Sequence, residues 1–200
     1  TINMADYSGE DAILLHYPER AEMFGIVNFG HTALLLQDKS GTWYYFSWGA
    51  RSTADKAALI TGTESSYYLD KLGKLKVERW SHIMALLMKS SDDSAIFELS
   101  SYIYMKGDFS GAFNYLKSLK GKKYYLLTQN CVQTCMTALR KGKFSKNNSY
   151  KQLALFFVYD EPVPNLVFAK WQKFYNSIDT YLEAPWWKQI FMKDPYKYLY

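Results

Sequence analysis

The chain has 200 residues, of which 48% are hydrophobic and 22% are charged. That length and balance can bury a core without a disulfide or a metal, which excludes intrinsic disorder and a disulfide scaffold. The net charge of +5 comes from scattered basic residues, and the lack of a dense basic face argues against nucleic acid as a partner. The excess would suit an anionic polymer such as a cell wall, or an acidic lipid surface.

Only two cysteines occur, Cys131 and Cys135, four residues apart. Such a pair is no disulfide framework, so a reducing compartment fits the chain. The first residues lack the basic start and the apolar stretch of a secretory signal. We therefore expect a cytoplasmic protein, or one exported by a route that uses no cleaved signal peptide.

The first part of the chain predicts a β-hairpin. Residues 13–16, Ile-Leu-Leu-His, indicate a short strand. Two apolar and aromatic runs, 26–37 and 42–48, flank a glycine-containing turn at 38–41. Paired runs around such a turn are typical of a hairpin.

The middle of the chain gives weaker signals. Residues 52–72 indicate a loop with helical pieces, and 74–80 alternate as a strand would. Residues 81–88 are apolar without clean alternation and remain open. The polar residues 91–94 suit a helix start, and apolar side chains at helical spacing then predict a helix over 94–105.

The last part of the chain is mostly predicted helical. Residues 109–119 form a helix closed by Lys-Gly, 124–127 a short strand, and a helix begins near Cys131 and ends at 141–142. Residues 152–159 are a buried strand or a short helix, and 167–175 a helix.

These elements predict an α+β fold, because strands and helices alternate without βαβ regularity. We expect one domain over 1–200. Within it, 160–200 would be an aromatic-rich C-terminal extension that clamps onto the core.

Cys131 is the candidate nucleophile. It follows the predicted helix cap Asn130, and the positive end of a helix favours a thiolate over a thiol. A thiolate needs a base, and His31 follows a glycine at the start of a predicted strand, where a sheet can present its ring to a cleft. We expect Cys135, one turn further on, to pack in the core.

Other interpretations of the same residues stay open. Cys131 could be a small buried hydrophobic residue without chemistry. A zinc site would need the two cysteines and two of the three histidines, but the paired spacings of zinc sites are missing, so no metal and no cofactor is expected. His16 and His82 are expected to be structural. The Gly-x-Ser-x-Gly turn of serine hydrolases is absent.

Two segments together carry a family resemblance. Residues 30–47 run from Gly-His-Thr to Tyr-Phe-Ser, and 126–135 read Leu-Leu-Thr-Gln-Asn-Cys-Val-Gln-Thr-Cys. This arrangement resembles the circularly permuted, NlpC-type branch of the papain-like thiol peptidases, which is related to the lecithin:retinol acyltransferase-like enzymes. The resemblance implies a papain-like core with an antiparallel sheet packed on helices. It also implies His31 as base and Cys131 as nucleophile.

The chain departs from the acyltransferase-like pattern at two places. Val-Gln-Thr follows Asn-Cys where those enzymes continue with Glu-His-Phe, and the second histidine of the paired strand is missing. If the hairpin pairs about residues 39–40, Ser47 is the side chain left to orient His31. A backbone carbonyl could do the same.

The remaining site residues follow from this interpretation. The backbone N–H of Cys131 would hold the oxyanion, with Gln129 and Asn130 beside it. Trp43 and Tyr45 would line the substrate pocket.

The expected function is a cysteine amidase or endopeptidase that cleaves an amide bond, with bacterial cell-wall peptide as the favoured substrate. It would act in wall remodelling or as an antibacterial effector, with a possible delivery partner or cognate inhibitor. A lipid acyltransferase or phospholipase would use the same pair, with 184–192 at the membrane, whereas membrane contact is not expected for the favoured peptidase. A binding module would use the aromatic residues, 18% of the chain, to line a groove without chemistry.

Overall fold

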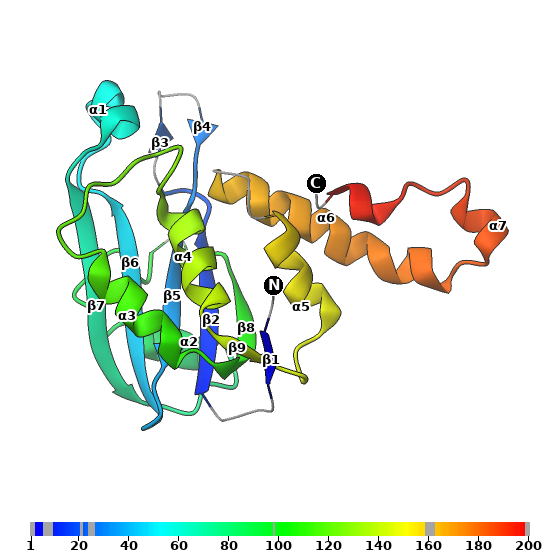
Figure 1. The fold of residues 1–200 in the computed structure, drawn as a ribbon, viewed down its shortest axis with the longest axis horizontal. Coiled ribbons are helices and arrows are strands. Elements are labelled where there is room, and N and C mark those ends of the chain that lie inside the picture. Colours follow the sequence, from blue (N-terminus) through cyan, green and yellow to red (C-terminus); the bar gives the residue numbers. More distant parts are fainter. Residues whose placement is uncertain are drawn as a thin grey trace.

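The computed structural model describes residues 3–5, 10–20, 22–23, 27–97, 99–158 and 163–198. Within these residues, seven strands form one sheet in the order β1-β9-β8-β2-β5-β6-β7, in which the described pairs are antiparallel except for β1 with β9 (Figure 1). The strands are β1 (Asn3–Ala5), β2 (Glu10–Tyr17), β5 (His31–Gln37), β6 (Thr42–Ala50), β7 (Ser65–Lys74), β8 (Ser101–Asp108) and β9 (Lys143–Ser145). A separate two-stranded sheet pairs β3 (Glu22–Met23) with β4 (Val27–Asn28).

The predicted hairpin is confirmed as β5 and β6, which pair antiparallel. Its turn is held by the Asp38 carboxylate, which accepts hydrogen bonds from the backbone N–H groups of Ser40 and Thr42. Gly41 has a φ of 79°, a conformation that glycine adopts at little cost. The strand predicted at 13–16 is the central part of β2.

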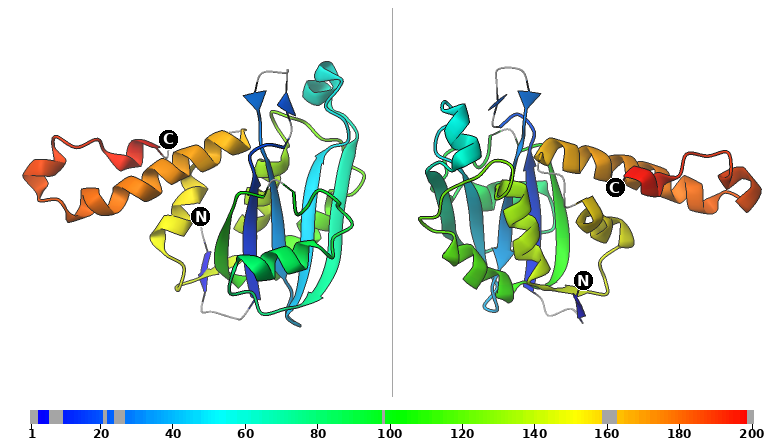
Figure 2. Two further views of the ribbon diagram at one scale, coloured as in Figure 1. Left: turned by 180° about the vertical axis from the view of Figure 1, so that it is seen from behind. Right: turned by 45° about the horizontal axis from the view of Figure 1, so that its top comes forward.

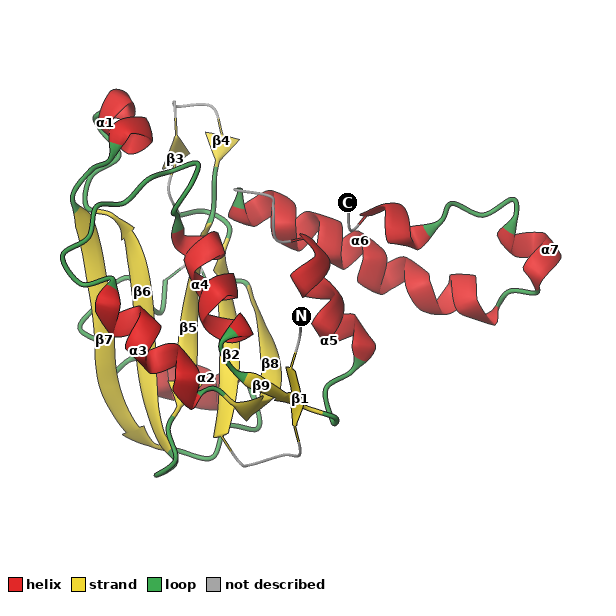
Figure 3. Cartoon of the chain, in the orientation of Figure 1, coloured by secondary structure: helices red, strands yellow, loops and turns green. Residues whose placement is uncertain are grey.

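Helices cover both faces of the sheet (Figure 3). On one face, α3 (Ser110–Ser118) and α4 (Cys131–Arg140) pack in a core with Leu34 and Phe46 of the hairpin. On the other face, α2 (Trp80–Leu87) packs in a second core with Leu35. Alternate residues of the strands therefore feed two cores, as expected for a sheet buried on both faces.

The middle of the chain differs from its prediction. Residues 52–72 do contain a short helix, α1 (Lys56–Thr61), but β7 then occupies 65–74 at the sheet edge. The strand predicted at 74–80 is wrong, since β7 ends at its first residue and α2 begins at its last. The open segment 81–88 lies almost entirely within α2.

The helix predicted over 94–105 is also wrong, because β8 begins at Ser101. Ile103 and Met105 are buried at alternate positions between β2 and β9, so the two-residue period prevails over the apparent helical one. The strand predicted at 124–127 is reduced to isolated bridges at Tyr124 and Tyr125.

The later helices agree with prediction. Residues 109–119 form α3, and the helix that begins near Cys131 is α4. The ambiguous segment 152–159 is helical as far as it is described, in α5 (Tyr150–Ala154) and the 3-10 turn η1 (Leu155–Val158). The helix predicted at 167–175 lies within α6 (Pro164–Glu183).

The C-terminal segment projects from the sheet as an arm (Figure 2). The first half of α6 joins the core through Val167 and Phe168. Beyond it come α7 (Trp186–Gln189) and the 3-10 turn η2 (Pro195–Tyr198), which folds back so that the Tyr196 ring lies 5.7 Å from the Phe174 ring. The prediction that the C-terminal extension packs onto the core is therefore wrong for α7, whose tryptophans are exposed. That the chain forms a single domain stays a prediction.

None of the described helices is both long and apolar enough to cross a membrane.

Candidate functional site

A cavity of about 480 Å³ lies where β5 begins and β6 ends. Cys131, His31 and Ser47 all line it. They come from α4, β5 and β6, and Cys131 is separated from the other two by more than eighty residues of chain. Because no local geometry forces such residues together, the tertiary fold alone assembles this group.

Cys131 is the first residue of α4, and a capping box fixes where that helix begins. The Asn130 side chain accepts a hydrogen bond from the backbone N–H of Gln133 at 3.1 Å, and the Gln133 side chain accepts one from the backbone N–H of Asn130 at 3.3 Å. The Asn130 amide also donates to the carbonyl of Leu126 at 2.7 Å. Asn130 is thus confirmed as the cap, but it is fully buried.

Burial favours the protonated form of the Cys131 thiol. Its residue is only 3% exposed, and burial raises the pKa of the thiol above its ordinary value. Polar groups of Thr32, Tyr124 and Val132 beside the sulfur lower that pKa and offset only part of the rise. Desolvation thus opposes the effect of the helix end, and the thiolate expected from the sequence stays a prediction.

His31 is the first residue of β5, and its ring lies beside Gly49 of β6. A Cβ atom at Gly49 would lie 3.6 Å from His31 Cε1, which is ordinary van der Waals contact. His31 Nε2 lies 2.8 Å from Ser47 Oγ, as the hairpin register suggested. Burial, aided by the charge of Arg20 and opposed by that of Asp92, lowers the pKa of His31 to about 3. The imidazole is thus neutral at physiological pH.

An ion pair that the sequence did not predict lines the same cavity. Arg20 Nη2 lies 3.2 Å from Asp92 Oδ1, and the Tyr45 hydroxyl donates a hydrogen bond to Asp92 Oδ2 at 2.8 Å. Arg20 also lies over the Tyr17 ring, with 4.9 Å from the guanidinium carbon to the ring centroid. Arg20 and Asp92 are 72 residues apart, and no local motif connects them.

Three predicted pocket residues lie elsewhere. Tyr45 is buried and does not line this cavity, but its hydroxyl interacts with Asp92 and Ser47, which do. Trp43 is buried beside a different cavity, where its indole N–H donates to the carbonyl of Leu75. Gln129 lines a third cavity, apart from Cys131. The aromatic walls of the Cys131 cavity are Phe29, Tyr68 and Tyr124 instead.

The remaining histidines and the second cysteine have other surroundings. His16 Nε2 lies 2.8 Å from Asn165 Oδ1, and its ring stacks on Phe168 with centroids 4.0 Å apart. His82 is exposed on α2 and contacts Arg79. Cys135 is buried in the core, as expected. Among the described residues, no three His, Cys, Asp or Glu side chains gather as metal ligands would.

Comparison with known proteins found similarity in structure and no match in sequence. No protein-family profile matches the chain, and no curated protein matches its sequence. The crystal structure of the type VI secretion system effector TseH is similar, with a TM-score of 0.50 and 15% identity, over 82% of this chain and 87% of that one. At this identity the likeness concerns the fold. It agrees with the predicted α+β, papain-like class, in which an antiparallel sheet packs on helices, and that prediction is confirmed.

Proposed function

We propose that the protein is a cysteine hydrolase in which Cys131 is the nucleophile, His31 the base and Ser47 the group that orients His31. One observation carries the proposal: a cysteine at a capped helix start and a histidine at a strand start, far apart in sequence, line one cavity. A nucleophile and a base in one cavity, with a third group on the base, are the components of covalent acyl transfer.

The hydrogen bond between His31 Nε2 and Ser47 Oγ supports Nδ1, the other ring nitrogen, as the base. With the imidazole proton on Nε2 and donated to Ser47 Oγ, Nδ1 carries the lone pair. His31 Nδ1 takes the proton of the Cys131 thiol as sulfur attacks the carbonyl carbon of an amide. His31 then returns that proton to the nitrogen as the C–N bond breaks, which leaves an acyl group on Cys131. Water, deprotonated by the same nitrogen, releases the acid and restores the thiol.

Helix α4 supplies the oxyanion contact. The backbone N–H of Cys131 stands in its first turn, where no carbonyl of the helix can accept it. This N–H can donate to the oxygen that becomes negative when sulfur attacks. In the resting state the Cys131 thiol and the His31 imidazole are both neutral. Charge therefore develops only as the substrate reacts and water leaves the cavity.

The substrate we favour is an amide within bacterial cell-wall peptide. Two observations support this choice: the sequence resemblance to NlpC-type, papain-like peptidases, and the fold likeness to a protein described as a type VI secretion effector. On this proposal the protein is an antibacterial effector, or a wall-remodelling enzyme, that acts after delivery. A delivery partner and a cognate inhibitor belong to the same proposal.

The test is digestion of purified peptidoglycan and its muropeptides, followed by mass spectrometry. The wild type is expected to cleave a peptide bond that Cys131→Ala leaves intact, while Cys135→Ala, one helical turn away, retains cleavage. If the wild type leaves every peptide bond intact, the cell-wall substrate is wrong. Release of fatty acid from phospholipid vesicles by the wild type alone would instead favour the lipid-ester reaction of the same residues.

A further inference from the structure

The far end of the C-terminal arm exposes large apolar side chains that nothing in the described chain covers. Within residues 186–191, Trp186 is 74% exposed, Trp187 57%, Ile190 68% and Phe191 86%. We call these four residues the apolar tip. Figure 1 shows α7 at the end of the arm, remote from the sheet.

The apolar tip is large for a surface feature. At about 200 Å² of surface per large side chain, the exposed fractions amount to roughly 500–600 Å². That is at the upper end of the largest apolar patch on an ordinary monomer, and such patches mark interaction sites. Other exposed apolar side chains, among them Met88 and Phe97, come from different elements of the chain.

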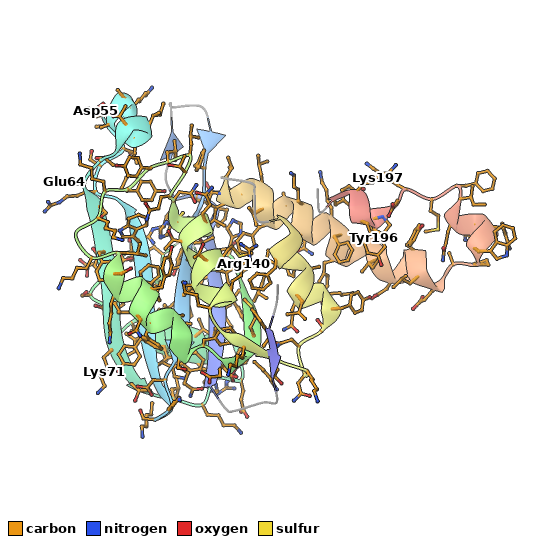
Figure 4. The ribbon with its side chains drawn as sticks, in the orientation of Figure 1. Asp55, Glu64, Lys71, Arg140, Tyr196 and Lys197 are labelled. Carbon is orange, nitrogen blue, oxygen red and sulfur yellow. The ribbon has the colours of Figure 1, made fainter. Side chains whose placement is uncertain are left out.

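The shape and size of the tip favour a lipid surface over a protein. A specific protein interface buries about 800 Å² on each partner and fits a complementary surface. The tip is smaller than this, and it lies at the convex end of an extended arm, visible with its side chains in Figure 4. A bilayer interface needs no matching shape, and a projecting arm can enter it without a clash with the sheet.

The chemistry of the tip matches the boundary between headgroups and acyl chains. Tryptophan is enriched at that depth, because its ring is apolar and its N–H stays near polar groups. Exposed Lys188 and Lys193 flank the apolar residues, and Lys193 also lies 4.9 Å from the Tyr198 ring centroid. The four acidic and basic side chains of 183–194 balance, but Glu183 and Asp194 lie at its two ends, and residues 186–193 carry the two lysines and no acid. The tip itself is therefore locally positive, which favours anionic lipid.

We propose that the apolar tip inserts into the interface of an anionic bilayer and so anchors the protein reversibly to a membrane. Trp186, Ile190 and Phe191 enter the boundary of the acyl chains, and Lys188 and Lys193 contact acidic headgroups. The anchor is independent of the chemistry at Cys131, because the cavity lies at the sheet, away from α7.

The test measures binding to vesicles of phosphatidylglycerol and phosphatidylcholine in equal parts, against vesicles of phosphatidylcholine alone. Co-sedimentation gives the partition constant, and lipids with brominated chains report whether tryptophan reaches the acyl region. We expect Trp186→Ser/Phe191→Ser to lower the partition constant about tenfold or more, because binding scales with buried apolar area. Lys188→Gln should lower it about fivefold on the acidic vesicles only. The matched control is Met88→Ser/Phe97→Ser, which removes two exposed apolar residues elsewhere.

Three results would overturn the proposal. The first is an absence of wild-type binding to the acidic vesicles at low salt. The second is equal loss in the control variant. The third is a concentration-dependent dimer, seen by sedimentation velocity, that Trp186→Ser/Phe191→Ser converts to monomer, since the tip would then bind a second copy of the chain. Cleavage of peptidoglycan is measured separately, so failure here leaves the proposed hydrolase untouched.

Discussion

Cys131 stands where a helix end favours a thiolate, yet burial raises the pKa of its thiol. His31 responds to burial in the opposite direction, and its pKa falls to about 3. Both shifts favour the neutral form of each group, so a neutral thiol and a neutral imidazole line the resting cavity. On the proposed mechanism, Cys131 therefore becomes nucleophilic when His31 accepts its proton, as the sulfur attacks.

This protonation state predicts slow alkylation of Cys131 at neutral pH. Because the folded pKa is raised, the thiolate fraction should grow only as pH rises beyond the ordinary value of 9.0. Iodoacetamide labelling followed by peptide mapping gives the rate at each pH, with the more deeply buried Cys135 as the internal reference. Rapid labelling of Cys131 with a plateau in mildly acidic solution would show a thiolate–imidazolium pair and contradict this assignment.

Ser47 should act on catalysis through His31 alone. Ser47→Ala removes the hydrogen bond of 2.8 Å, and since a neutral bond of this kind contributes about 1 kcal/mol, we expect kcat to fall about five- to tenfold with KM unchanged. Ser66→Ala, another serine of the cavity wall, is the matched control. A change in KM with kcat preserved would make Ser47 a substrate contact instead.

At the scale of elements, the sequence predicted correctly those elements whose stabilising contacts lie within a few residues of one another. The β5–β6 hairpin has its turn chemistry within four residues, and α4 has its cap at Asn130. In contrast, β7 and β8 became strands by pairing with β6 and with β2 and β9, and no short stretch of sequence shows those pairing partners. The same reason explains the wrong strand at 74–80.

The cap of α4 should contribute to both stability and activity. Asn130→Ala loses the bond from the Gln133 N–H and leaves the buried Leu126 carbonyl without its 2.7 Å donor, so we expect about 2 kcal/mol lower free energy of unfolding. Activity should fall as well, because the start of α4 positions Cys131.

The matched control is Ser149→Ala, which removes the equivalent cap of α5. It should lower the free energy of unfolding by about 1 kcal/mol and leave activity unchanged. Urea unfolding and kcat/KM distinguish the two; equal effects of both variants on kcat/KM would contradict the role of the cap at the site.

At the scale of the whole molecule, the topology brings together residues that no sequence pattern connects. Cys131 and His31 were predicted as a pair from their local sequence contexts and a family resemblance, and the fold puts both on one cavity. The Arg20–Asp92 pair beside them joins two loops and leaves no local trace. Trp43 and Tyr45 were misassigned because strand alternation shows that residues share a face, but not whether that face meets solvent or a second core.

Burial of neutral His31 should make the stability of the whole protein fall in acid. The unfolded chain binds a proton near the ordinary pKa of 6.5, while the folded protein binds it only near 3. Stability is therefore full above 6.5 and declines as pH drops toward 3, by at most about 1.4 kcal/mol per pH unit from this group. His16, whose pKa is also lowered by burial, adds in the same direction. Urea unfolding between about pH 7 and about pH 4 should show a smaller loss for His31→Gln than for the wild type; equal losses would contradict the shift.

The central claim is that Cys131 attacks a carbonyl with His31 as its base. Reaction with an activated peptide ester, followed by intact mass spectrometry and peptide mapping, tests it without knowledge of the natural substrate. The account predicts an acyl group on Cys131 and none on Cys135, formed about a hundredfold more slowly in His31→Ala. An unmodified Cys131, or an acylation rate that His31→Ala leaves unchanged, would contradict it.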